Sequence, residues 1–258
     1  MDGDSVKMPR FFVDPQYIGP ESITVEGENY NHIKNVLRLK KDDSIVICDG
    51  LGTDYMGYIE DFGQGIVKVK IISTERNKTE PPVNVTLYQG LPKADKMEYI
   101  IQKSVELGIA RIVPVITGRT IVKLDDAKDA EKKTSRWQKI ASEAAKQCNR
   151  GIIPSVELPI TFKGALNSVR ESGFNLIPYE NEQEVTLKSC LTEASGHKDI
   201  SFFIGPEGGF TEEEVDIAKK SGVIPVSLGP RILRTETAGI SLLSIIMYEL
   251  GDMGKKSF

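Results

Sequence analysis

Two glycine- and proline-rich stretches near the C-terminus carry residue types that can hold a ligand through the backbone. Residues 205–210 read GPEGGF and residues 228–238 read LGPRILRTETA. Each follows an apolar run, residues 200–204 and 223–228, that predicts a buried strand, and each precedes a helical pattern. Ligands of open α/β sheets bind at the carboxyl ends of the strands, and glycine lets the backbone approach them closely. We therefore expect the two loops to line one pocket.

The common glycine-loop chemistries do not fit the first stretch. GPEGGF has neither the Lys-Ser/Thr of a Walker loop nor the spacing of a dinucleotide fingerprint. The carboxylate of Glu207 disfavours a phosphate and suits a ligand with hydroxyls or positive charge, or the N-terminus of a helix. Each loop taken alone is equally consistent with an ordinary strand-to-helix turn. The two together, in this order, are more specific.

Few side chains are available for metal or triad chemistry. The chain has two histidines, His32 and His197, and neither a GxSxG nor an HExxH motif. Its three cysteines, Cys48, Cys148 and Cys190, form no CxxC pair, so neither disulfides nor zinc is predicted. The sequence favours a metal-free protein of a reducing cytoplasm.

Composition is that of an ordinary soluble protein. The 258 residues are 40% hydrophobic and 27% charged, enough for one large domain or two smaller ones. The longest apolar pattern, residues 238–250, is too short for a membrane span, and the acidic, polar N-terminus predicts no signal peptide. The net charge of −4 argues mildly against nucleic acid, but residues 91–150 hold more Lys and Arg than Asp and Glu (13 against 8). On charge alone, solvated helix faces explain that excess.

Strand and turn patterns predict a first domain. Short strands are expected at residues 23–25, 44–48, 55–59 and 66–72, with one helix at residues 30–38 between them. This pattern predicts a small β-barrel-like domain. The polar stretch 75–82, which ends in two prolines, is the expected linker.

Alternating strands and helices predict an α/β second domain. Parallel strands are expected at residues 83–89, 111–115, 174–178, 200–204 and 223–228. Thr211 and Glu214 form a capping box at the start of the helix after GPEGGF. Residues 240–250 predict a helix that is apolar nearly all round and hence buried on several sides, as in a central core helix. Pattern alone indicates an unknotted, doubly wound sheet.

Together these motifs resemble the RsmE family of SPOUT RNA methyltransferases, over nearly the whole chain. Further matching segments are PRFFV at residues 9–13, the VLR-containing segment 32–39, KADKME at 93–98, QKSVELG at 102–108 and the helix 136–150. The residues before Met8 form an extension that the family usually lacks, which makes Met8 the expected start, and Cys148-Asn149 replaces smaller residues. The resemblance implies S-adenosylmethionine-dependent methylation of uridine N3 in 16S ribosomal RNA, on the assembled 30S subunit.

The resemblance also implies an architecture. Residues 1–75 are expected to form a PUA-like, RNA-binding β-barrel domain. Residues 76–258 are expected to form a SPOUT α/β domain with a deep trefoil knot, which binds the cofactor and forms a homodimer whose interface adjoins the cofactor site.

The implied cofactor site lies in the knot, where apolar side chains sandwich the adenine and backbone amides read its edge. Its residues are Pro178, Glu180, Ile204, Gly205, Pro206, Glu207, Gly208, Gly209, Leu228, Gly229, Pro230, Ile232 and Leu233.

Methyl transfer to N3 is an in-line displacement, and N3 attacks only after its imide proton has left, which spreads negative charge onto O2 and O4 of the uracil. Arginine stabilises such charge well, so Arg234 and Arg231 are the candidate catalytic residues, with a phosphate clamp as the alternative for either. No residue is assigned as the base.

Basic residues predicted to bind RNA are Arg10, His32, Arg38, Lys93, Lys96, Arg119 and Arg150. Two alternatives remain open: a SPOUT enzyme that methylates another RNA position or a ribose 2′-hydroxyl, and a noncatalytic RNA-binding protein.

Overall fold

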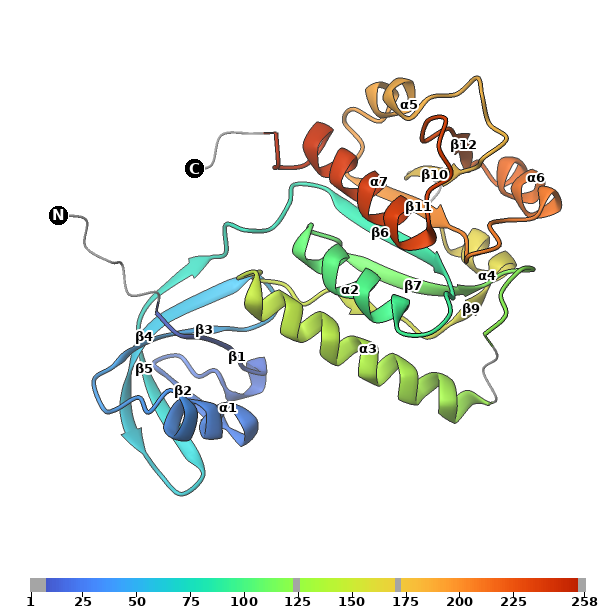
Figure 1. Cartoon of the computed structure of the whole chain (residues 1–258). Coiled ribbons are helices and arrows are strands. Elements are labelled where there is room, and N and C mark those ends of the chain that lie inside the picture. The colour runs from blue at the N-terminus through green and yellow to red at the C-terminus, as the bar shows by residue number, and fades with distance from the viewer. Residues whose placement is uncertain (1–7, 123–125, 170–172, 255–258) are drawn as a thin grey trace. The chain divides into compact units, whose positions relative to one another are not determined.

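The computed structural model describes residues 8–122, 126–169 and 173–254 (Figure 1). The extension before Met8 lies outside these residues. The chain divides into two compact units: Met1–Glu80 with Ala145–Ile153, and Pro81–Ala144 with Pro154–Phe258. The boundary expected from the sequence lies after residue 75, whereas the first unit extends to Glu80 and also contains Ala145–Ile153.

A five-stranded sheet forms the first unit, in the order β1-β3-β4-β5-β2. Its strands are β1 (Arg10–Phe12), β2 (Ser22–Glu26), β3 (Ser44–Cys48), β4 (Thr53–Phe62) and β5 (Ile66–Arg76). All neighbours are antiparallel except β1 and β3. Residues Ile23, Val25, Ile45, Ile47, Ile59, Val67 and Val69 alternate along the strands and build the core. The four strands predicted in this unit are confirmed, and β1 was missed.

The helix predicted at residues 30–38 is displaced. The short helix α1 (Gly27–Asn31) runs into a π-helical turn, η2 (His32–Val36), and the 3-10 turn η1 (Pro15–Tyr17) precedes both in the chain. Helical backbone ends before Arg38 because that residue adopts a positive φ of 54°.

A parallel seven-stranded sheet forms the second unit, in the order β12-β10-β11-β6-β7-β8, with β9 beside β7. Its strands are β6 (Asn84–Gly90), β7 (Arg111–Ile116), β8 (Ser155–Val156), β9 (Ile160–Thr161), β10 (Phe174–Pro178), β11 (Asp199–Ile204) and β12 (Ile224–Val226). The five strands predicted here are confirmed, with β12 shorter than expected; the two-residue strands β8 and β9 were missed.

Strand order places the site. From β6 the chain continues to β7 on one side, whereas β11 leads to β12 on the other. The neighbours β6 and β11 therefore mark the point where the winding direction changes, and open α/β sheets bind ligands outside the carboxyl ends of such strands. Residues 90–95 and the GPEGGF loop emerge there.

Helices of the second unit are α2 (Lys96–Glu106), α3 (Ala127–Gln147), α4 (Phe162–Ser168), α5 (Leu187–Glu193), α6 (Glu212–Lys220) and α7 (Thr235–Glu249). The capping box predicted for Thr211 and Glu214 is present at the start of α6. No helix in the described part of the chain has the length and apolar character needed to cross a bilayer.

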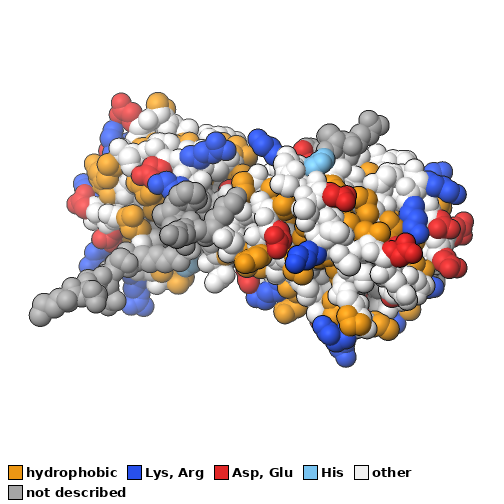
Figure 2. Space-filling model, turned by 90° about the horizontal axis from the view of Figure 1, so that it is seen from above, with side chains coloured by type: hydrophobic (Ala, Val, Ile, Leu, Met, Phe, Trp, Pro, Cys, Tyr) orange, Lys and Arg blue, Asp and Glu red, His pale blue; other side chains and the backbone are white. Residues whose placement is uncertain are grey.

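Helices α2 and α7 pack side by side, and α7 also contacts β6 and β11 (Figure 1). One face of α7 is buried through Leu242, Leu243 and Ile246, but Ile245 and Tyr248 are 41% and 62% exposed. The expected burial on several sides is thus incomplete in a single chain. Figure 2, which looks onto the molecule from above, shows hydrophobic side chains gathered between scattered charges on this unit.

Candidate functional site

Close backbone packing shapes the GPEGGF loop. A Cβ on Gly205 would lie 2.9 Å from the backbone of Gly209, and one on Gly90 would lie 2.6 Å from the Pro206 ring. Gly209 itself has a positive φ of 67°. Larger residues at positions 90 and 205 would displace the chain. The loop is therefore folded back on itself and pressed against the end of β6.

A buried polar relay joins this loop to α7. Gln89 Nε2 donates hydrogen bonds to the Gly90 carbonyl (3.0 Å) and to Thr235 Oγ1 (2.9 Å). Thr235 Oγ1 in turn donates to the Gly205 carbonyl (2.6 Å). Gln89 is fully buried and Thr235 is 6% exposed. The relay fixes the positions of β6, the GPEGGF loop and the first turn of α7 relative to one another.

A second, more exposed connection runs through Glu207. Its carboxylate accepts from the Lys93 backbone N–H (3.1 Å) and pairs with Lys96 Nζ (3.0 Å). Burial alone would raise the pKa of Glu207, but hydrogen bonds from its own backbone N–H, from Lys96 and from Lys93 outweigh burial and lower it. The hydrogen bond with Glu207 raises the pKa of Lys96 in turn. Lys96 Nζ also lies 3.4 Å from Glu236 Oε2 on α7.

Two further loops adjoin GPEGGF. Arg119, after β7, donates to the Gly208 carbonyl at 2.7 Å, and the neighbouring Gly118 N–H donates to Glu214 of the α6 capping box at 2.7 Å. After β10, the exposed carboxylate of Glu180 faces Gly209, where a Cβ would lie 3.6 Å from its Oε2. The predicted residues of 178–180 and 205–209 are therefore neighbours in space.

The second predicted loop lies beside a cavity. Leu228, Gly229 and Leu233 line a space of about 830 Å³, together with residues of α5 and α7. Ile232 is 93% exposed, so in this chain it does not line an apolar pocket as predicted. Arg231 and Arg234 are exposed and make no ion pair among the described residues. Arg234 is the residue immediately before α7.

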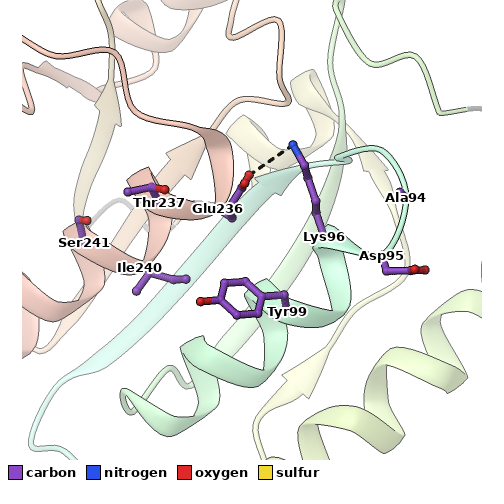
Figure 3. A pocket seen from close by; sticks show the side chains of 8 residues that line it. All are labelled: Ala94, Asp95, Lys96, Tyr99, Glu236, Thr237, Ile240 and Ser241. Carbon is purple, nitrogen blue, oxygen red and sulfur yellow. Dashed lines mark ion pairs between the residues drawn. The ribbon is translucent and has the colours of Figure 1, made fainter.

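Figure 3 shows a smaller cavity of about 680 Å³ between α2 and α7. Lys96 reaches across it to Glu236, and the Tyr99 ring lies between the two helices, near Ile240. The remaining lining residues are Ala94, Asp95, Thr237 and Ser241.

Several residues predicted to bind RNA have other contacts in the structure. Arg10 forms an ion pair with Asp54 at 2.6 Å, and Arg150 pairs with Glu80 at 2.6 Å with its side chain only 5% exposed. Both arginines form ion pairs within the first unit, and RNA binding by either stays a prediction. Lys96 and Arg119 hold the GPEGGF loop, as described above.

The other three predicted RNA ligands, His32, Arg38 and Lys93, are exposed. The residues that sequence reasoning missed are Gln89 and the hydroxyl of Thr235. Thr235 lay inside a recognised motif, but nothing in the sequence indicated that a buried amide of β6 would meet it.

No group of three or more His, Cys, Asp or Glu side chains is placed to hold a metal in the ranges that the structure describes.

Comparison with known proteins identifies the family. Residues 79–247 match the RNA methyltransferase domain and residues 25–72 the RNA methyltransferase PUA domain. The ribosomal RNA small subunit methyltransferase E of Bacillus subtilis is 36% identical over 94% of this chain and 97% of its own length. The chain belongs to the ribosomal RNA small subunit methyltransferase E family. The family indicated by the sequence motifs is thereby confirmed.

Other relatives are similar to this chain over nearly its whole length. The relative from Buchnera aphidicola (Acyrthosiphon pisum) is 32% identical, with 95% of both chains covered. A crystal structure of the Neisseria gonorrhoeae enzyme bound to S-adenosyl methionine superposes with a TM-score of 0.85 at 33% identity, covering 95% of this chain and 99% of that one. A methyltransferase from Legionella pneumophila, solved with its bound cofactor SAM, gives a TM-score of 0.84 at 32% identity, with 96% and 100% covered.

Proposed function

We propose that this protein transfers a methyl group from S-adenosylmethionine to N3 of a specific uridine in 16S ribosomal RNA, on the assembled 30S subunit. The observation that carries the proposal is the set of loops after β6, β10 and β11, held together at the carboxyl edge of the parallel sheet. S-adenosyl methionine is bound in the neisserial relative, whose sequence is 33% identical to that of this chain.

The loops fit this cofactor chemically. Gly205 lets the loop fold closely back onto Gly209, and the Glu180 carboxylate beside Gly209 suits ribose hydroxyls or the amino group of methionine. Residues 228–233 are proposed to contact the cofactor as well, with Leu228, Gly229 and Leu233 beside the cavity that they line. When bound, S-adenosylmethionine supplies an electrophilic methyl group on its sulfonium.

Arg234 is the proposed catalytic residue, with Arg231 beside it. Both are exposed, so neither side chain is committed to the protein core. A guanidinium there can stabilise the uracil anion as N3 attacks. If an arginine instead contacts an RNA phosphate, its removal weakens RNA binding more than turnover.

A homodimer and a deep trefoil knot are part of the proposal. Exposed apolar side chains on the packed helices α2 and α7, among them Tyr99, Ile245 and Tyr248, suit an interface with a second copy. The knot is supported by the path of the chain: β12 pairs at the sheet edge with β10, yet the helix that follows it packs on β6 and β11. The segment between β12 and α7 must therefore cross back over the sheet.

We further propose that the PUA-like first unit binds the RNA and that the protein works in the cytoplasm. The substrate is the folded small subunit, because an acidic protein has weak nonspecific attraction to RNA and depends on the shape of its target.

The test is mass spectrometry of nucleosides from 30S subunits and from free 16S RNA incubated with the protein and cofactor. We expect N3-methyluridine, with the higher yield on 30S subunits, and none when the cofactor is omitted. A methylated ribose would replace the proposed reaction with 2′-O-methylation. RNA binding without cofactor binding by calorimetry would indicate a noncatalytic RNA-binding protein.

A further inference from the structure

An irregular turn on the first unit presents apolar side chains to solvent. Helix α1 passes into the π-helical turn η2 (His32–Val36), and Arg38 follows with a φ of 54°. Left-handed backbone costs a non-glycine residue about 1–2 kcal/mol, and π-helical turns are found frequently at functional sites. A strained turn of this kind indicates a conformation kept for a purpose other than stability.

The turn is anchored on both sides and exposed at its tip. Ile33 is fully buried in the core of the first unit, and Leu39 packs against the same core. Between these anchors, Val36 is 67% exposed and Leu37 is 42% exposed. The anchors hold the tip in place, so its apolar side chains face solvent because of the backbone and not because the segment is loose.

Cations surround the apolar tip. Lys34, Arg38, Lys40 and Lys41 are all exposed, and none forms an ion pair among the described residues. Lys34 Nζ instead donates to Tyr30 Oη at 2.7 Å. The acidic residues on the same stretch are Glu28, Asp42 and Asp43, and the last is engaged by the Lys40 backbone N–H at 2.7 Å. Positive charge therefore predominates beside Val36 and Leu37.

We propose that the tip formed by Val36, Leu37 and Arg38 inserts among unpaired nucleotides of the RNA target. Val36 and Leu37 contact exposed base faces, while Arg38, Lys40 and Lys41 contact the flanking phosphates. This inference rests on the proposed function, because it takes RNA to be the partner. Unpaired RNA is the expected form because only unstacked bases offer their faces to side chains.

Other partners fit the tip less well. Two apolar side chains are far fewer than a stable protein interface requires. The four cations within eight residues favour a phosphate backbone. The family model that matches this unit, residues 25–72, is that of an RNA methyltransferase PUA domain.

Binding of full-length variants to 30S subunits across a range of KCl concentrations tests the proposal. In Val36→Ser/Leu37→Ser we expect about tenfold weaker binding at every salt concentration with an unchanged salt slope, because base contacts are apolar. Arg38→Gly retains the positive φ and should lower the salt slope by about one phosphate contact. The matched control is Ile72→Ser, since Ile72 is 68% exposed on β5 of the same unit; its binding should equal that of the wild type.

Chemical probing of the bound 16S RNA separates insertion from simple surface contact. Nucleotides made reactive by the wild-type protein should stay unreactive with the double serine variant. The proposal would be overturned if the double variant bound 30S subunits with wild-type affinity. It would also be overturned if Ile72→Ser weakened that binding as much as the double variant does. Product analysis is independent of these measurements: RNA binding that depends on the tip without formation of N3-methyluridine would refute the proposed function and leave the insertion intact.

Discussion

Replacing Thr235 with valine removes one hydroxyl and preserves the shape of the side chain. The hydroxyl donates to the Gly205 carbonyl at 2.6 Å and accepts from Gln89 Nε2 at 2.9 Å, in a position that is 6% exposed. Gln89 keeps its second hydrogen bond, to the Gly90 carbonyl at 3.0 Å. The substitution therefore mainly removes the hydrogen bond to the Gly205 carbonyl, at the first residue of the GPEGGF loop.

The expected loss of stability follows from the single carbonyl that is left without this hydrogen bond. A buried polar group left unsatisfied costs about 1–3 kcal/mol, so we expect the free energy of unfolding of the second unit to fall by about 2 kcal/mol. Part of the loss appears as disorder of the loop, which cofactor binding must reverse. A penalty of about 1.4 kcal/mol corresponds to about tenfold weaker S-adenosylmethionine binding.

The assay is calorimetric titration of the cofactor, with urea unfolding measured on the same samples. Thr235→Ser keeps the hydroxyl and should restore most of the cofactor affinity. Thr237→Val makes the same substitution on the same turn of α7 at an exposed residue and should leave the affinity unchanged. Cofactor affinity of Thr235→Val within twofold of the wild type would refute the role of the relay.

Four further predictions test the site and the proposed dimer interface. Gly90→Ala places a Cβ 2.6 Å from the Pro206 ring and should weaken cofactor binding, whereas Gly239→Ala meets only ordinary contacts at 3.6 Å or more and should not; equal titration curves would contradict this. Tyr248→Glu should shift the sedimenting species from dimer to monomer at micromolar concentration, because the side chain is 62% exposed on the proposed interface. Arg234→Ala should lower kcat more than RNA affinity, and equal losses would make it a phosphate clamp. Because the folded pKa of Glu207 is lowered from 4.5, its stabilising contacts are present above that pH and are lost as pH falls through the folded pKa; Glu207→Gln should reduce this acid sensitivity in pH-dependent unfolding.

Sequence alone determined the family and most of the strands of both units. The apolar runs Ser44–Cys48, Phe174–Pro178 and Asp199–Ile204 were visible because strand burial leaves a local pattern. Glycines 205 and 209 were visible because a bare backbone requires that residue type. The capping box of Thr211 and Glu214 is likewise a local signal with a fixed spacing.

Local patterns failed where the backbone is strained or an element is very short. Arg38 reads as the end of a regular helix, yet the structure gives it a positive φ after a π-helical turn. Strands β8 and β9 have two residues each, too few to show any period. The exposed face of α7 could not be predicted either, because a helix that is apolar all round does not indicate which of its sides packs against its own chain.

Only the tertiary structure decided which side chains meet. Arg10 and Arg150 look like surface cations in the sequence, but Asp54 and Glu80 are far from them along the chain and neutralise them in the folded first unit. Gln89 and Thr235 are separated by 146 residues, and their hydrogen bond exists because α7 packs on β6 and β11. Hydrogen bonds and ion pairs depend on distances of a few ångströms in space, and residue spacing along the chain encodes those distances only within a single helix, strand or turn.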